Sequence, residues 1–180
     1  MEKSFDLAIV GGGYAGLAAA NRAAQLGLKA VVLERGAEEA YPCNSRYAGG
    51  VLHVSYHNVT DPVPELTRAI VEIGEGWTRP ELASAMAGSS ARAVEWLMAE
   101  GAELGPPANS SWRKHVLAPV RPPVNQMEKG HGSDVALTRL ERNFTGRGGE
   151  FHRSARATSL IVEDGRCAGV NIDNNGSRHA

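Results

Sequence analysis

The sequence predicts an α/β fold that begins with a strand–helix–strand unit and ends in antiparallel strands. Two short apolar runs, residues 7–10 and 30–33, have the length and composition of strands in a parallel sheet. An alanine-rich stretch between them is typical of a helix that packs closely on a sheet. Near the other end, two strand-like segments flank Asp164-Gly165, a dipeptide that favours a tight hairpin turn. A chain of 180 residues has room for one domain or slightly more.

The N-terminal unit has the most regular pattern. Residues 7–10 form a continuous apolar run, so we expect this strand to be buried on both faces of its sheet. The following helix should cover residues 14–26, because Gly27 is a favourable residue immediately after a helix C-terminus. Residues 30–33 form the second buried strand.

The middle of the chain predicts two helices after an irregular segment. Residues 37–59 are punctuated by glycine and show no regular period, whereas residues 61–74 place apolar side chains on one helical face. The next helix should begin at a capping box with Thr78 as the N-cap and Glu81 three positions later, and it should end at Gly101.

The C-terminal part predicts a loop, a helix and strands. Five prolines in residues 102–130 indicate a long ordered loop or short extended pieces. Ser133 or Asp134 can cap a helix that ends near residues 146–149. Residues 157–162 and 167–172 should then pair as a hairpin.

The sequence Asn174-Asn175-Gly176-Ser177 is a second hairpin signal. Only three residues follow it, so we expect the chain to stop within a β-meander, as a truncated fold would.

Composition excludes several classes of partner. The net charge is -1, from 19 basic and 20 acidic residues, which gives no electrostatic reason to expect nucleic acid or an anionic membrane. The apolar stretches are too short to span a bilayer, and the first residues lack the pattern of a signal peptide. Cys43 and Cys167 show neither metal-ligand spacing nor a CxxC pattern. We therefore expect a cytoplasmic protein with free thiols and no metal site.

The chemistry is concentrated in Gly11–Gly16, which reads GxGxxG between a strand and a helix. Gly11 permits the tight turn, Gly13 lets a pyrophosphate approach the backbone, and Gly16 lets helix and strand pack closely. Glu34 ends the next strand, 18 residues after Gly16, where a carboxylate can accept hydrogen bonds from ribose hydroxyls. This combination predicts a dinucleotide-binding βαβ unit.

The motif alone does not distinguish FAD from NAD. Its N-terminal position and the lack of further strand–helix repeats favour FAD, and the carboxylate of Glu34 disfavours a 2′-phosphate. Two alternatives remain: an NAD-linked dehydrogenase domain, and a truncated chain without an activity of its own.

Residues 6–20 and 31–35 resemble the opening of the fumarate reductase/succinate dehydrogenase flavoprotein family, which includes 3-ketosteroid and tricarballylate dehydrogenases. Asn44-Ser45 followed by residues 48–50 is similar to the second flavin-contacting segment of that family. Residues 157–170 resemble its β-meander, in which backbone near Ala157 would contact adenine.

The resemblance implies a Rossmann-like FAD-binding domain with an inserted partial capping region and a terminal β-meander. Residues 1–58 would hold the first two FAD-binding segments, residues 59–130 the capping region, and residues 131–180 the return to the FAD-binding domain. The residues expected to bind FAD are Gly11, Gly13, Tyr14, Ala15, Gly16, Glu34, Arg35, Asn44, Ser45, Gly49, Gly50 and Ala157.

The resemblance also implies an FAD-dependent oxidoreductase that moves hydride between flavin N5 and a carbon of a small-molecule substrate. Members with covalent flavin carry a histidine in the second segment, where this chain has Cys43-Asn44-Ser45, so we expect non-covalent FAD. The catalytic acid and the substrate-binding residues of the family lie downstream of the meander, so no catalytic residue and no electron-transfer partner is assigned.

Overall fold

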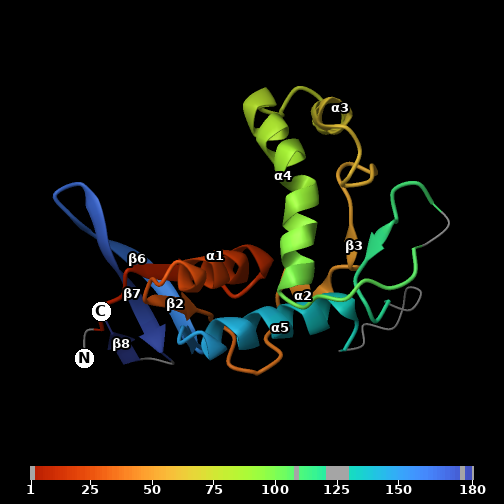
Figure 1. Ribbon diagram of the computed structural model, residues 1–180. Helices are drawn as coiled ribbons and strands as arrows, with labels where there is room; N and C mark the ends of the chain where they lie inside the picture. The colour runs from red at the N-terminus through yellow and green to blue at the C-terminus, as the bar shows by residue number, and fades with distance from the viewer. Residues whose placement is uncertain (1–2, 108–109, 121–129, 175–176, 180) are drawn as a thin grey trace. The chain divides into compact units, whose positions relative to one another are not determined.

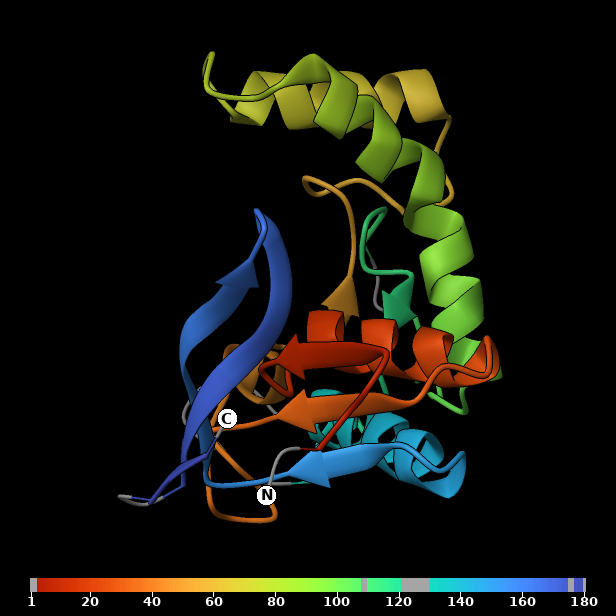
Figure 2. The ribbon, with the colours of Figure 1, turned by 90° about the vertical axis from the view of Figure 1, so that its left-hand side faces the viewer.

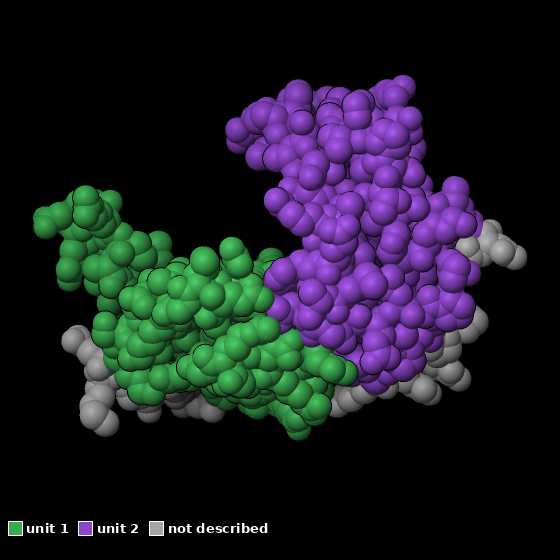
Figure 3. All heavy atoms as spheres, viewed as in Figure 1, with its two compact units in different colours: residues 1–47, 137–180 green, residues 48–136 purple. Residues whose placement is uncertain are grey.

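The computed structural model describes residues 3–107, 110–120, 130–174 and 177–179 (Figure 1). The chain divides into two compact units, shown in different colours in Figure 3. The first unit combines residues 1–47 with residues 137–180, and the second consists of residues 48–136.

The first unit is built on a three-stranded parallel sheet. Its strands are β1 (Leu7–Val10), β2 (Ala30–Leu33) and β5 (Glu150–His152), in the order β1-β2-β5, and their arrows run the same way in Figure 2. Helix α1 (Tyr14–Gln25) connects β1 to β2 as the crossover that a parallel pair requires. Gly27, with φ +77°, follows the helix at the position predicted for its C-terminus.

The core of this sheet lies on β2. All four β2 residues are buried, and Val32 packs in a cluster with Ala20 and Ala23 of α1 and with Phe144. The expectation that β1 is buried on both faces is wrong, because Val10 is 59% exposed. The physical reason is the strand order, in which β2 is central and β1 lies at an edge of the described sheet.

The remaining elements of the first unit form a meander and two helical segments. Strands β6 (Ala155–Glu163), β7 (Arg166–Asn174) and β8 (Ser177–His179) pair antiparallel in that order. The predicted Asp164-Gly165 turn is confirmed, with φ +48° and +74°. The predicted turn at 174–177 includes residues 175–176, which lie outside the described residues, although β8 pairs with β7 beyond it.

The first unit also contains one short helix and most of one long helix. The short helix α2 (Asn44–Tyr47) replaces part of the irregular segment expected from residues 37–59. The long helix α5 (Gly132–Gly146) begins within one or two residues of the predicted start and ends in the predicted region.

The second unit contains a helix pair and a small antiparallel ladder. Helices α3 (Val63–Ile73) and α4 (Pro80–Ala99) share a core with the segment that precedes them, and strand β3 (Val51–Leu52) pairs with β4 (His115–Val116). Strand β4 lies in residues 102–130, and it is one of the short extended pieces expected there as an alternative to a loop. The buried core residues are Val54, Val59, Leu66, Ile70, Ala83, Ala87 and Val94.

The capping box predicted for α4 is wrong. The N-cap is Arg79, and no side chain caps the helix. The hydroxyl of Thr78 instead donates to the Ile70 carbonyl at 3.3 Å, so it closes the connection between the two helices. In the described parts of the chain, no helix has both the length and the apolar character needed to cross a membrane.

Candidate functional site

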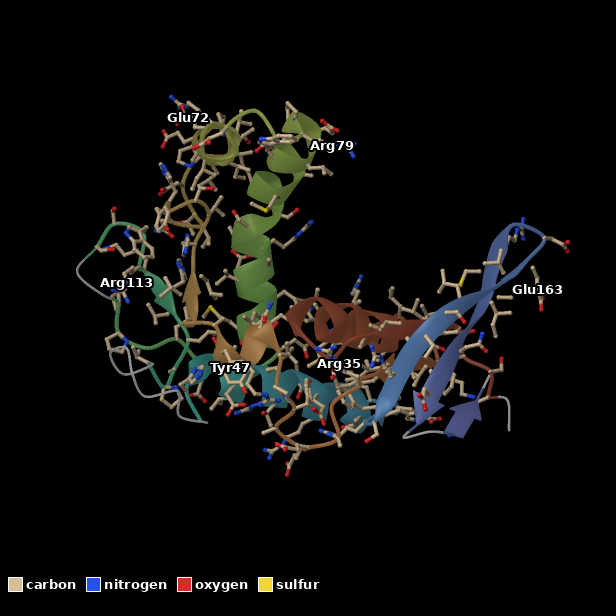
Figure 4. All side chains as sticks on the ribbon, turned by 180° about the vertical axis from the view of Figure 1, so that it is seen from behind. Arg35, Tyr47, Glu72, Arg79, Arg113 and Glu163 are labelled. Atoms are coloured by element: carbon tan, nitrogen blue, oxygen red, sulfur yellow. The ribbon has the colours of Figure 1, made fainter. Side chains whose placement is uncertain are left out.

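A cavity of about 800 Å³ opens at the carboxyl ends of β1 and β2 in the first unit. This is the edge where open α/β sheets bind their ligands. Two lining residues, Arg35 and Tyr47, mark its position in Figure 4. The full lining consists of Val10, Gly11, Gly12, Gly13, Leu33, Glu34, Arg35, Pro42, Cys43, Asn44, Ser45, Tyr47, Ala155, Arg156 and Ala157.

The glycine turn between β1 and α1 forms one wall of this cavity. Gly11 has φ +95°, a conformation that favours glycine, and its amide donates to the Leu33 carbonyl at 2.9 Å. A Cβ at Gly16 would lie 2.0 Å from the Gly11 carbonyl oxygen, so only glycine lets α1 start so close to the turn. The roles predicted for these two glycines therefore agree with their geometry.

The N-terminus of α1 is available to an anion. Gly13 is the N-cap and provides no side-chain cap, and the first turn of the helix holds no acidic residue. The first amides of a helix have no carbonyl partner within it and carry partial positive charge. One of them, at Tyr14, donates to Ser45 Oγ at 3.0 Å. The other amides of this first turn can donate hydrogen bonds to a phosphate group.

Glu34 forms a buried, hydrogen-bonded wall of the cavity. Its side chain is 5% exposed; Oε2 accepts from the Gly12 amide at 2.9 Å, and Oε1 accepts from the Gly36 amide at 2.8 Å. Each carboxylate oxygen can accept a second hydrogen bond. The predicted contact with ribose is therefore compatible with this geometry, but the bond to the glycine turn is a role that the sequence reasoning missed.

Tyr41 lies directly behind the glycine turn. Its side chain is fully buried, and its hydroxyl donates to the Gly12 carbonyl at 2.6 Å. The ring stacks on Phe151, with 5.6 Å between the centroids. Burial, assisted by the nearby Glu141 carboxylate, raises the pKa of Tyr41 well above its usual value of 10.0. Tyr41 thus stays protonated and remains a hydrogen-bond donor.

The cavity brings together seven of the twelve predicted FAD-binding residues. They are Gly11, Gly13, Glu34, Arg35, Asn44, Ser45 and Ala157. Tyr14, Ala15 and Gly16 form the first turn of α1 without lining the cavity.

Gly49 and Gly50 belong to the second unit. There, Gly50 has φ +77°, and its carbonyl accepts a hydrogen bond from the Leu117 amide at 2.8 Å. Their assignment to FAD remains a prediction.

Sequence reasoning missed eight lining residues. Gly12 and Cys43 could have been found, since each adjoins a residue that was predicted. Ala155 had no such signal, because its place depends on the hydrogen bond from its amide to the Glu34 carbonyl, between parts of the chain more than a hundred residues apart. The missed residues are Val10, Gly12, Leu33, Pro42, Cys43, Tyr47, Ala155 and Arg156.

A family model described as "FAD binding domain" matches residues 6–180. The chain belongs to this FAD-binding domain family. The glycine backbone, the open helix N-terminus and the buried carboxylate of Glu34 fit the pyrophosphate and ribose that such a domain must hold. The predicted cofactor, FAD, is therefore confirmed.

Solved structures with the same fold include a dehydrogenase and fumarate reductases. 3-Ketosteroid-Δ4-(5α)-dehydrogenase from Rhodococcus jostii RHA1, in complex with 4-androstene-3,17-dione, has a TM-score of 0.80 at 18% identity. A flavocytochrome c3 fumarate reductase in its open conformation has a TM-score of 0.75 at 18% identity. The FrdA chain of E. coli quinol fumarate reductase has a TM-score of 0.71 at 17% identity. These are the kinds of protein that the N-terminal motif resembles, so the predicted fold is confirmed.

The chain corresponds to part of each of these structures. The match covers 97%, 96% and 94% of this chain in turn, but 43%, 31% and 29% of the three solved chains. The comparison with curated proteins gives no match. The chain thus contains an FAD-binding domain, and it spans less than half the length of these three solved chains.

Proposed function

We propose that this chain is the FAD-binding part of an oxidoreductase that transfers hydride between flavin N5 and a carbon atom of a small-molecule substrate. The reaction would oxidise a C–C single bond or reverse that oxidation. The observation that carries the proposal is the cavity at the carboxyl ends of β1 and β2, where the N-terminus of α1 meets the buried carboxylate of Glu34. The solved structures of the same fold include a dehydrogenase and fumarate reductases.

The residues that line the cavity are assigned to different parts of FAD according to their chemistry. Gly11 and Gly13 expose backbone to the pyrophosphate, and amides of the first turn of α1 donate to it. The carboxylate of Glu34 accepts from ribose hydroxyls, and Arg35, the next residue in the chain, also lines the cavity. The backbone of Ala157 contacts adenine.

The flavin half of the cofactor is assigned to the second segment. Asn44 and Ser45 line the same cavity and present polar side chains, and Gly49 and Gly50 follow them in the chain. When bound, FAD supplies a ring that accepts or gives hydride at N5. No residue of this chain is assigned the role of proton donor.

We propose that FAD is held without a covalent bond. No histidine is among the residues that line the cavity in the described part of the chain, and the second segment carries Cys43, Asn44 and Ser45. Denaturation should therefore release the whole cofactor into solution.

We also propose the division of the chain into residues 1–58, 59–130 and 131–180, with the middle part serving as a capping region. The two free cysteines, Cys43 and Cys167, are consistent with a reducing compartment and support a cytoplasmic location. The reaction needs a small-molecule substrate and an electron acceptor or donor, whose identity is not assigned.

The decisive test is the visible absorption spectrum of the purified chain, with chromatography of any nucleotide released on denaturation. Stoichiometric FAD, either retained or restored by incubation, is the expected result. NAD without flavin would replace this proposal with an NAD-linked dehydrogenase domain. A folded chain, with normal circular dichroism, that takes up neither nucleotide would show that this polypeptide has no cofactor chemistry of its own.

A further inference from the structure

We propose that Tyr41 is a positioning residue that holds the glycine turn in its cofactor-binding conformation before FAD arrives. The inference rests on FAD binding in the cavity described above and deepens it. It assigns a role to a side chain that does not line the cavity and that no sequence motif singled out.

The Gly12 residue is held on both of its polar groups by side chains. Its amide donates to Glu34 Oε2 at 2.9 Å, and its carbonyl oxygen accepts from the Tyr41 hydroxyl at 2.6 Å. Both partners are buried, Glu34 at 5% exposure and Tyr41 at 0%. Hydrogen bonds in such surroundings are poorly replaced by water, so they fix the orientation of the Gly12 residue.

The space around Gly12 is fitted to these partners. A Cβ at Gly12 would lie 2.8 Å from the Tyr41 hydroxyl oxygen and 2.8 Å from Cζ of Phe151. The aromatic pair therefore packs directly against the backbone of the turn. This close approach gives a physical reason for glycine at a position that the dinucleotide-binding motif leaves unspecified.

Tyr41 is itself held rigidly by cations and by its own backbone. The Arg46 guanidinium lies 4.9 Å from the centre of the Tyr41 ring, and Arg46 Nε donates to the Tyr41 carbonyl at 3.0 Å. Arg153 lies 4.8 Å from the Phe151 ring centre and pairs with Glu141. The hydroxyl consequently has a fixed direction, which a group must have to position another.

A turn that is formed in advance loses less conformational freedom when it binds its ligand. If Tyr41 performs this function, removing its hydroxyl should loosen the turn in the flavin-free chain and weaken FAD binding. The amides that face the phosphate would then be correctly oriented for a smaller fraction of the time.

The test compares Tyr41→Phe with Tyr56→Phe. The first substitution keeps the buried ring and deletes the hydroxyl, whereas the second deletes the hydroxyl of a tyrosine that is 61% exposed in the other unit. We expect Tyr41→Phe to raise the Kd for FAD about tenfold, as fluorescence titration would measure. Amide exchange at Gly12 in the flavin-free chain should accelerate by a similar factor, about tenfold. Tyr56→Phe should change neither quantity.

A double-mutant cycle with Glu34→Ala, which removes the acceptor of the Gly12 amide, separates positioning from a general loss of stability. If both side chains act through Gly12, the effect of Tyr41→Phe on FAD affinity should be smaller in the Glu34→Ala background. Strictly additive effects would overturn the proposal, as would a tenfold change in affinity with unchanged exchange at Gly12.

Amide exchange in the wild-type chain tests the proposal even if Tyr41→Phe does not fold. In the flavin-free wild-type chain, Gly12 should exchange much more slowly than Gly76, which lies in an exposed turn. Equal rates would overturn the positioning role. A wild-type chain that binds no FAD but protects Gly12 would contradict the proposed function and leave the role of Tyr41 in shaping the turn supported.

Discussion

The two sides of the cavity differ in how the chain makes them. The motif side consists of the lining residues between Val10 and Arg35, which one strand–helix–strand unit brings together. The distal side consists of the lining residues in 42–47 and 155–157, which reach the cavity through contacts between distant parts of the chain. The first side contains three consecutive glycines, and the second contains the polar residues Asn44, Ser45 and Arg156.

This difference shows that the dinucleotide-binding motif does not stand alone. The hydroxyl oxygen of Ser45 accepts a hydrogen bond from the Tyr14 amide. The hydroxyl of Tyr41, next to the distal side, donates a hydrogen bond to the Gly12 carbonyl. Side chains that lie outside the motif thus hold its backbone in place. Substitutions on the motif side should mainly abolish binding, and substitutions on or next to the distal side should weaken it by degrees.

The largest effect is expected for Gly13→Asp on the motif side. A Cβ at this position would lie 3.1 Å from Ser45 Oγ, and the added carboxylate would repel the pyrophosphate at the N-terminus of α1. We expect FAD affinity to fall more than about a hundredfold, which corresponds to roughly 2.7 kcal/mol. Equilibrium dialysis with FAD measures this loss of affinity.

The matched control for this variant is Gly88→Asp. Gly88 lies in α4 of the second unit, where no other atom lies within 4 Å of an added Cβ. It adds the same charge and should retain normal FAD affinity. If Gly13→Asp bound FAD with normal affinity, the proposal that the pyrophosphate lies at the N-terminus of α1 would be wrong.

Sequence reasoning succeeded where a structure depends on local spacing. Strands β1 and β2 were predicted at their observed residues, because a short apolar run between turn signals is sufficient to define each of them. The motif predicts the tight turn at Gly11, because a turn with positive φ favours glycine and the motif has glycine at this position.

Sequence reasoning failed where a long-range contact decides the structure. Strand β5 (Glu150–His152) has three residues and no apolar run, and it exists because it pairs with β2. Helix α2 has one turn without an apolar period. The sequence does not predict the role of Tyr41, because nothing local indicates that its hydroxyl reaches Gly12, 29 residues earlier.

The second largest effect is expected for Gly16→Ala, which acts on the stability of the motif side. The new Cβ would lie 2.0 Å from the Gly11 carbonyl oxygen and 3.3 Å from Cγ2 of Ile9, so α1 would have to move away from β1. Overpacking of this kind costs about 1–3 kcal/mol in the free energy of unfolding. Urea denaturation of the flavin-free chain measures the loss.

Gly88→Ala is the control for this substitution because it makes the same change in a helix with open space around it. There, alanine should stabilise the chain by about 0.5–1 kcal/mol, since glycine is unfavourable in a helix interior. Two substitutions of the same type should therefore have opposite signs. Equal effects would mean that the approach of Gly16 to the turn does not matter.

The next effect concerns Tyr41 and alkaline pH. The pKa of Tyr41 is raised above 10.0 in the folded chain, so the folded state keeps this proton while the unfolded state loses it as the pH rises. The contribution of Tyr41 to stability is therefore complete below pH 10 and declines above it, by up to about 1.4 kcal/mol per pH unit.

Denaturant unfolding of the wild-type chain and of Tyr41→Phe, at neutral pH and above pH 10, isolates this contribution. Groups common to both chains cancel in the difference, which should shrink as the pH rises, because the phenylalanine side chain of the variant has no proton to lose. A difference that stays constant across this range would show that the hydroxyl titrates normally and is not sequestered behind the glycine turn.

The smallest effect is expected for Ser45→Ala on the distal side. Its Oγ accepts the Tyr14 amide at 3.0 Å, and the hydroxyl hydrogen remains available to donate to a phosphate oxygen. Loss of the first bond should cost about 0.5–1 kcal/mol of stability, in the range of a helix cap. Loss of the second should weaken FAD binding about fivefold. Ser84→Ala, at an exposed position of α4, should leave FAD affinity unchanged and should not lower stability.

The ratio of these two losses at Ser45 is informative about the distal side. If the serine only caps α1, stability falls and FAD affinity does not, because a phosphate oxygen can accept the vacated Tyr14 amide. If it also contacts the cofactor, both quantities fall together, as the geometry predicts. Thermal unfolding measured with and without saturating FAD separates the two cases, because a direct contact lowers the stabilisation that FAD adds.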